Sequence, residues 1–455
     1  MPRKAALVLA AIATGMTPTT AAALPDDPEL GQPWVTEIAV PEAWDVTTGD
    51  PSVVVAVVDT GVDLSHPDLA PNAWRNAGEQ ANGADDDGDG LVDDLAGWSF
   101  GRDSGDVADP SGHGTHVAGL VAARGGNGIA SAGVCWSCTI LPVDVYREGG
   151  RGTLHDLASG MAYAAERARI VNLSLESPVA SEEVASVVTS HPDRLFVVSA
   201  GNGGRDVDAA PSWPCAVAAP NLLCVAADDA GAPAEGANWG ARSVHLAAPG
   251  VALVSTAPGG GVAAMTGSSF AAPLVAGTAA LLWSWRPDAS VEEVRAAILA
   301  GADRLGSWSG RTVTGARLNA IGALRAFAAL RGEQPPDAVV APVSPSAVAA
   351  PVSATASSSS PVLPSPLAIV SPRARASRGG VRVRLHCGSR VNTCTGTLHA
   401  LGQLRRFTVA PHRSVTVRLR ARRAFRLGAR RSSGASLRVV VRAGSRSRLF
   451  RVRVR

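Results

Sequence analysis

Short, almost purely apolar segments alternate with helical segments from residue 40 to about residue 327. We expect buried strands over five segments rich in valine, isoleucine and leucine: 53–58, 139–145, 170–174, 195–199 and 222–226. Segments 153–168 and 182–190 have helical spacing; Thr153 with Asp156 resembles a capping box, and Ser290 with Glu293 is a clear one. Apolar strands that alternate with helices are typical of a parallel sheet with helices on both faces. The sequence therefore predicts a three-layer α/β domain.

The charge distribution divides the chain into two parts. The formal net charge is +3, but residues 371–455 contain 23 arginines and no lysine, aspartate or glutamate. The rest of the chain has 19 basic and 39 acidic residues, a formal charge of −20. Such an asymmetry indicates two modules with different surfaces.

The composition places the boundary between these modules in a linker. Residues 333–372 are rich in Pro, Ala, Val and Ser, which is typical of an extended, semi-rigid connection. Beyond it, four segments largely alternate apolar and polar residues, as half-buried strands do: 381–385, 414–419, 437–441 and 450–454. We therefore expect a first domain over 24–332, the linker over 333–372, and a small all-β sandwich over 373–455.

Residues 1–23 have the three parts of an export signal. Arg3 and Lys4 supply the positive start, residues 5–13 the apolar stretch, and Ala21–Ala23 a cleavage site of small residues. No later segment reaches the roughly 18 uninterrupted apolar residues of a membrane span. We expect a secreted, extracellular protein.

The six cysteines lie in three close pairs. In an oxidising compartment the simplest interpretation is three local disulfides, Cys135–Cys138, Cys215–Cys224 and Cys387–Cys394. Cys135 and Cys138 also match a redox or zinc motif, but a lone C-x-x-C is weak evidence. No second pair stands at zinc-ligand spacing. The sequence favours disulfides.

Three segments supply a carboxylate, an imidazole and a hydroxyl. Asp59 ends a predicted strand, His113 lies between two glycines at the start of an apolar helix, and Ser269 enters another helix. Strand C-termini and helix N-termini meet at one edge of a parallel sheet, where a crevice forms. A serine becomes nucleophilic when an imidazole takes its proton and a carboxylate orients that imidazole. The order Asp, His, Ser is one of the known triad orders and differs from the Ser-first order of α/β-hydrolases.

Asn202 is the fourth residue of this kind. It follows the predicted strand 195–199 and places an amide donor at the same edge. A fixed donor for a developing oxyanion is worth about 10²–10³ in rate. The backbone N–H of Ser269, at a helix N-terminus, is a second donor for the same charge.

From the segment 41–49 to residues 318–320, roughly 60% of the chain, these motifs resemble the subtilisin-like serine protease family. The resemblance implies a serine endopeptidase that forms an acyl-enzyme and needs no cofactor for its chemistry. It implies that Asp59 orients His113, that His113 is the general base and acid, that Ser269 is the nucleophile, and that Asn202 stabilises the oxyanion. The rival hypothesis is a catalytically silent binding or adhesion protein on a protease scaffold.

The resemblance also implies a peptide-binding surface. The residues that match the family's substrate-binding positions are Gly150, Arg151, Gly152, Ser174, Leu175 and Gly201. Two positions depart from the family, since Ser268 replaces the usual threonine and Glu176 the usual glycine. A carboxylate near the entrance of the primary pocket alters which side chains are accepted, so specificity does not carry over.

An acidic segment has the spacing of a calcium loop. Asp85, Asp87, Asp89 and Asp93 occupy positions 1, 3, 5 and 9, with glycine at 6, but Ala96 stands where a glutamate is expected at 12. We weigh structural calcium, which would brace the loop, against a solvated acidic turn.

The arginine-rich domain has two interpretations. Outward-facing arginines keep an exposed sheet soluble and protect its edges, or they bind an anionic surface or polymer. Aromatic residues for stacking on bases are nearly absent, so base-specific recognition is not expected. We favour an anionic tether on a monomeric enzyme whose substrates are proteins and peptides. About seventeen residues, 24–40, separate the signal from the family-like segment, and we expect folding without an attached inhibitory pro-segment.

Overall fold

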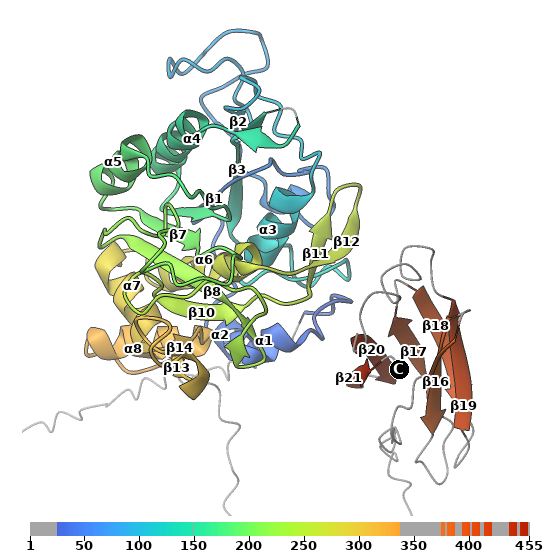
Figure 1. Ribbon diagram of the computed structural model, residues 1–455. Helices are drawn as coiled ribbons and strands as arrows, with labels where there is room; N and C mark the ends of the chain where they lie inside the picture. The colour runs from blue at the N-terminus through green and yellow to red at the C-terminus, as the bar shows by residue number, and fades with distance from the viewer. Residues whose placement is uncertain are drawn as a thin grey trace, which may run out of the picture. The chain divides into compact units, whose positions relative to one another are not determined.

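The computed structural model describes residues 25–147 and 149–336, and the backbone of seven strands between residues 375 and 453. It divides into two compact units, Met1–Val343 and Ser344–Arg455 (Figure 1). The boundary lies inside the predicted linker. The predicted signal, most of the linker and Cys387 lie outside the described residues.

Within the described part of the first unit, ten strands form one mixed sheet in the order β13-β14-β10-β8-β7-β6-β1-β3-β2, with β9 beside β8. The strands are β1 Val54–Asp59, β2 Trp98–Ser99, β3 Thr139–Asp144, β6 Ile170–Leu173, β7 Leu195–Ser199, β8 Leu222–Asp229, β9 Ala232–Pro233, β10 Leu246–Pro249, β13 Asp303–Arg304 and β14 Ala316–Arg317. Every pairing from β2 to β14 is parallel, as predicted. The two-residue strands β9 and β13 are antiparallel additions.

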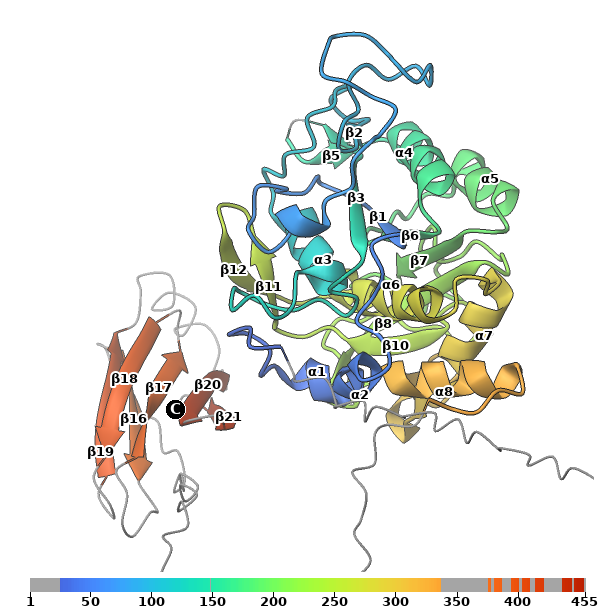
Figure 2. The same cartoon turned by 180° about the vertical axis from the view of Figure 1, so that it is seen from behind.

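Helices cover both faces of this sheet (Figures 1 and 2). The helices are α1 Pro33–Glu37, α2 Val40–Trp44, α3 His113–Ala122, α4 Leu154–Arg167, α5 Glu182–Ser190, α6 Ser268–Trp285, α7 Val291–Ala300 and α8 Ala320–Leu330, with short 3₁₀ turns at Ala70–Asn72 and Gly306–Trp308. In β1, Val55 and Val57 join the core that contains α3 and α6, while Ala56 and Val58 join the core that contains α4. Because side chains alternate along a strand, an apolar strand must be covered on both sides.

The predicted helix starts differ in detail. Ser290 and Glu293 form a complete capping box at α7. At α4 the Thr153 hydroxyl accepts the backbone N–H of Asp156 at 3.0 Å, and the Asp156 carboxylate binds Arg147 and also interacts with Thr153. Thr153 therefore caps α4 as the sequence predicted.

The strand order determines where the site forms. The chain passes from β1 to β3 on one side and then crosses to β6 on the other side of β1. In open α/β sheets a crevice lies at the carboxyl ends of strands where the order reverses in this way. Asp59 ends β1, and Ser174 follows the adjacent strand β6.

Two antiparallel hairpins lie outside the large sheet: β4 Tyr146–Arg147 with β5 Arg151–Gly152, and β11 Leu253–Ala257 with β12 Gly261–Met265. The structure contains the disulfides Cys135–Cys138 and Cys215–Cys224. Among the helices described, none combines the length and apolar character that a membrane crossing requires.

The second unit is all-β where it is described. Its strands are β15 Arg375–Ser377, β16 Gly380–His386, β17 Cys394–Ala400, β18 Gln403–Val409, β19 Ser414–Arg420, β20 Ser436–Ala443 and β21 Arg446–Arg453. They pair antiparallel in two sheets, β15-β16-β19 and β18-β17-β20-β21. The packing of these sheets as a sandwich stays a prediction.

Candidate active site

Asp59 and His113 meet at the carboxyl edge of the sheet. The Nδ1 atom of His113 lies 2.7 Å from Oδ1 of Asp59, a carboxylate that is 1% exposed and also accepts the N–H of Thr60. Since a carboxylate only accepts, Nδ1 carries the proton and Nε2 is left as the acceptor. Burial opposes protonation of the ring, but the charge and hydrogen bond of Asp59, with the charge of Asp109, outweigh it and raise the pKa of His113 above its ordinary value.

Asp109 fixes the start of α3, a role that the sequence reasoning missed. Its Oδ1 accepts Thr60 Oγ1 and the N–H groups of Ser111 and Gly112, and its Oδ2 accepts both the N–H and the hydroxyl of Thr115. These bonds join the turn after Asp59 to the first turn of α3. The sequence feature that could have predicted this role is an aspartate four residues before the helix, whose N-cap is Gly112.

Ser269 lies in the first turn of α6, against the end of β6. Pro273 lies inside α6 and has no N–H, so the Ser269 carbonyl four residues earlier receives no helical hydrogen bond. The hydroxyl of Ser174 donates to that carbonyl at 2.6 Å, and the Ser269 hydroxyl donates to the Ser174 carbonyl at 3.0 Å. The two segments are therefore locked together.

His113 contacts the helix that carries Ser269 but makes no direct hydrogen bond to that serine in the described structure. The His113 ring lies 5.1 Å, between centroids, from the ring of Phe270, the residue after Ser269. Within residues 25–147 and 149–336, the Ser269 hydroxyl is bonded to Ser174 and not to the imidazole. Such contacts are often long or misaligned before substrate binds.

Asn202 lies beside the N-terminus of α6. Its Oδ1 accepts the N–H of Ser268 at 2.9 Å and the Ser268 hydroxyl at 3.3 Å, while the Ser268 hydroxyl also accepts the N–H of Gly201. The side-chain carbonyl of Asn202 is thus bound to the first residue of α6. The amide nitrogen of this exposed side chain remains as the hydrogen-bond donor that can face a substrate. Ser268 makes these bonds although a threonine is usual at its position.

The predicted peptide-binding residues line the same edge. Gly150, Arg151 and Gly152 belong to the β4–β5 hairpin, and Ser174 is buried at the end of β6. A cavity of about 470 Å³ lies between this hairpin and the turns beside Asp59 and His113, lined in part by Thr60, Ser111, Tyr146, Gly149 and Gly150. Of the predicted peptide-binding residues, Gly150 lines this cavity.

His116 is a buried residue of the core beneath the site. It is 0% exposed, and its Nε2 lies 3.1 Å from the Leu253 carbonyl and 3.2 Å from the Ala263 carbonyl. Because carbonyls only accept, Nε2 carries the proton. Burial lowers the pKa of His116 to about 4, so the ring is neutral at physiological pH.

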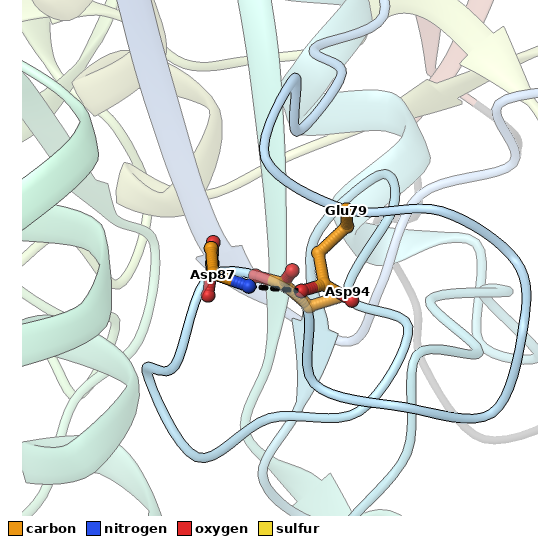
Figure 3. Close-up of side chains that lie close together, drawn as sticks. All are labelled: Glu79, Asp87 and Asp94. Carbon is orange, nitrogen blue, oxygen red and sulfur yellow. Dashed lines mark hydrogen bonds between the residues drawn. The ribbon is translucent and has the colours of Figure 1, made fainter.

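The acidic loop gathers two groups of carboxylates that share Asp87. Asp85, Asp87 and Asp89 form one, and Glu79, Asp87 and Asp94 the other, each with oxygens within 4.8 Å of one another. Figure 3 shows the second group. That spacing fits oxygen ligands around one Ca²⁺ at 2.3–2.6 Å. Asp93 belongs to neither group; its carboxylate accepts the N–H groups of Asn82 and Gly83. Glu79 and Asp94 were not predicted.

The carboxylates of this loop already have protein partners. Glu79 accepts the N–H groups of Asp86, Asp87 and Asp93, and Arg167 pairs with Asp89. Burial raises the pKa of Asp94, although hydrogen bonds from Tyr163 and Asn76 oppose this. The donor set suits a hard cation, and a cation bound at Asp89 would displace Arg167.

A family model described as the subtilase family matches residues 50–323, which include Asp59, His113, Asn202 and Ser269. The chain belongs to the subtilase family. This subtilase is 34% identical over 292 residues to thermitase of Thermoactinomyces vulgaris, covering 64% of this chain and 94% of thermitase. It is 35% identical over 286 residues to a thermophilic serine proteinase of Bacillus sp. strain AK1, covering 62% of this chain and 64% of that relative.

A solved protease from Pseudoalteromonas arctica has the same fold as the subtilase unit. The TM-score is 0.57 at 25% identity, covering 67% of this chain and all of that one. The subtilase unit is thus a serine endopeptidase by family, with the subtilisin-like α/β fold that the sequence predicted.

Proposed function

We propose that this subtilase is a secreted, monomeric endopeptidase that cleaves proteins by acyl transfer. In this mechanism His113 Nε2 takes the proton of Ser269, whose oxygen attacks the scissile carbonyl and expels the amine after His113 protonates it. Asp59 keeps Nδ1 protonated and stabilises the imidazolium. Water then attacks the acyl-enzyme while His113 takes its proton. His113 returns that proton to the Ser269 oxygen as the acid is released. The 2.7 Å contact between His113 and Asp59 beside the α6 N-terminus is the observation that carries the proposal.

The oxyanion is assigned to two donors. The Asn202 amide and the backbone N–H of Ser269 lie at one end of α6, whose N-terminal dipole also favours negative charge. The tetrahedral intermediate gains these bonds as its charge develops, so they accelerate the chemical step.

Pre-steady-state hydrolysis of an activated ester tests this mechanism. The wild type is expected to release one equivalent of alcohol in a burst as the acyl-enzyme accumulates, and Ser269→Ala none. Asn202→Ala is expected to retain a burst but to acylate about 10²–10³ times more slowly. A wild type with no burst and no peptidase activity would favour the silent binding protein instead.

The acidic loop is proposed to hold structural calcium through Asp85, Asp87 and Asp89. Calcium would neutralise the crowded carboxylates and brace residues 79–94, and it takes no part in the chemistry. The site is tested through stability, which does not depend on catalysis.

The arginine-rich unit is proposed to bind an anionic polymer. In the backbone register of β15, β16 and β19, Arg375 pairs with Arg382 and Arg382 with Arg418, so three arginines occupy one register position across these strands. Like charges opposite each other destabilise a sheet, and residues 371–455 contain no acidic residue to offset them. A bound anionic partner would offset this positive charge. The full chain is expected to elute from a heparin column at lower salt when these three arginines are changed to glutamine, and unchanged elution would contradict the proposal.

A further inference from the structure

Glu176 lies against the segment that carries the oxyanion donor. Its Oε1 accepts the N–H of Asn202 at 3.2 Å, and its Oε2 accepts the Ser212 hydroxyl at 3.1 Å and the Asn238 amide at 3.4 Å. The carboxylate therefore spans from the turn at Asn202 to the buried Ser212.

Gly201 shows how closely the carboxylate approaches this turn. Gly201 has a φ of +98°, and a Cβ built there would lie 1.8 Å from Glu176 Oε2. A side chain at residue 201 is thus excluded by both its backbone conformation and the carboxylate. Glu176 directly follows Ser174–Leu175, and its carboxylate lies against Gly201, both of which the family resemblance assigned to substrate binding.

The charge of Glu176 is only weakly balanced within the described residues. Among the described residues it forms an ion pair with Arg205, at 3.6 Å, and the side chains of Glu176 and Arg205 are 33% and 38% exposed. Partly exposed pairs at this distance are weak, and the remaining partners of the carboxylate are neutral. The buried Nε of Arg205 has no hydrogen-bond partner in the described structure, so this guanidinium is poorly held. A second cation therefore competes readily for the carboxylate.

The position of Glu176 relative to Ser269 and Asn202 determines which substrate side chain contacts its carboxylate. Under the proposed mechanism, on which this step rests, the scissile carbonyl lies between Ser269 and the Asn202 amide. Glu176 binds the backbone N–H of that same asparagine and follows Ser174 by two residues. The side chain on the acyl side of the bond is therefore the one that reaches the carboxylate.

We infer that Glu176 makes the primary specificity pocket anionic, so that this subtilase cleaves after lysine or arginine. An ammonium or guanidinium group replaces Arg205 as the partner of Glu176 and forms a charge-assisted hydrogen bond with this half-buried carboxylate. Arg205 acts as the internal competitor for that position. An apolar side chain of similar length gains no such bond and leaves the Glu176–Arg205 pair in place.

The test uses quenched peptides that differ only in the residue before the cleaved bond: Lys, Arg, Met, Leu or Glu. The wild type is expected to give a kcat/KM for Lys and Arg at least tenfold above that for Met. Glu176→Gln keeps an acceptor for the Asn202 N–H, so it is expected to lose that preference while its rate on Met changes little. Arg205→Gln is expected to raise the Lys-to-Met ratio severalfold. The exposed Glu235→Gln serves as the control and should leave the ratio unchanged.

Two results would overturn the inference. One is a wild-type preference for Met, Leu or Glu that Glu176→Gln does not alter. The other is an equal loss of kcat/KM on all five peptides in Glu176→Gln, which would make Glu176 a support for Asn202 rather than a specificity residue. If no peptide is cleaved and no ester burst occurs, the proposed function fails and the inference with it. Cleavage with the wrong preference leaves the proposed function intact.

Discussion

Ser174 and Ser269 bind each other through two hydrogen bonds that run in opposite directions. Each hydroxyl donates to the other residue's carbonyl, at 2.6 Å from Ser174 and 3.0 Å from Ser269. The first bond exists because Pro273 leaves the Ser269 carbonyl without its helical donor. Ser269 is thereby held against the end of β6, the strand beside Asp59.

Ser174→Ala is expected to loosen the nucleophile. The Ser269 carbonyl loses its partner, which costs about 1–3 kcal/mol where the group stays buried. We expect kcat to fall by roughly tenfold and thermal stability to fall, with KM less affected. Steady-state kinetics normalised by active-site titration measure this effect. Ser186→Ala on the exposed face of α5 is the control, and equal kinetics for the two variants would contradict the role of Ser174.

The pH dependence of kcat/KM follows from the Asp59–His113 pair. His113 acts as a base only when neutral, and its pKa is raised, so activity is expected to rise with pH through a midpoint above the ordinary imidazole value of about 6.5. Asp59→Asn removes the charge that raises this pKa. Its midpoint is expected to fall while kcat drops by about 10⁴. An unchanged midpoint in Asp59→Asn would show that another group controls the acid limb.

Stability in acid is expected to depend on two histidines, the buried His116 and the half-buried His245. Burial lowers the pKa of both His116 and His245 to about 4, and His245 Nδ1 accepts the N–H of Cys224. Between pH 6.5 and 4 the unfolded chain therefore binds more protons than the native one, and stability falls as the pH falls. The loss is on the order of 1–3 kcal/mol per histidine.

Denaturant unfolding at several pH values measures this dependence. His245→Gln is expected to flatten the decline, whereas His155→Gln is not, since His155 is 78% exposed. A decline of the same steepness in His245→Gln and wild type would assign the acid sensitivity to other groups.

Calcium removal is expected to lower the melting temperature without changing the triad. EDTA should reduce the Tm by several degrees and excess Ca²⁺ should restore it, since an ion that binds only the native state adds to stability. Asp87 belongs to both carboxylate groups, so Asp87→Asn should abolish the difference made by EDTA. Asp193→Asn, at an exposed site, should keep it. A wild type that EDTA does not affect would favour the solvated acidic turn.

The sequence predicted the parts of the site that depend on local position. Asp59 ends an apolar strand, and His113 and Ser269 lie in the first turns of helices. A parallel sheet brings such strand ends and helix starts to one edge, and this does not depend on the conformation of the loops. The two-residue strands β9 and β13 carry too little pattern to be predicted, and their antiparallel pairing follows from tertiary packing.

Contacts between distant residues were not predictable. Ser174 and Ser269 are 95 positions apart, and their mutual bonds depend on how α6 packs on the sheet. Calcium-loop spacing predicted Asp93 as a ligand together with Asp85, whereas in the structure Asp93 has a left-handed φ of 57° and its carboxylate accepts the N–H groups of Asn82 and Gly83. Glu176 was recognised as unusual, but its bonds to Asn202 and Ser212 required the structure.

Labelling with a fluorophosphonate probe tests the central claim most directly, because the probe reacts only with a serine that a neighbouring base has activated. Intact-mass measurement should show one probe per wild-type molecule, located by peptide mapping at Ser269. Ser269→Ala should show none and His113→Ala far slower labelling, while the control His191→Ala should react like wild type. Equal labelling of wild type and Ser269→Ala, or a wild type that does not react at all, would contradict the account.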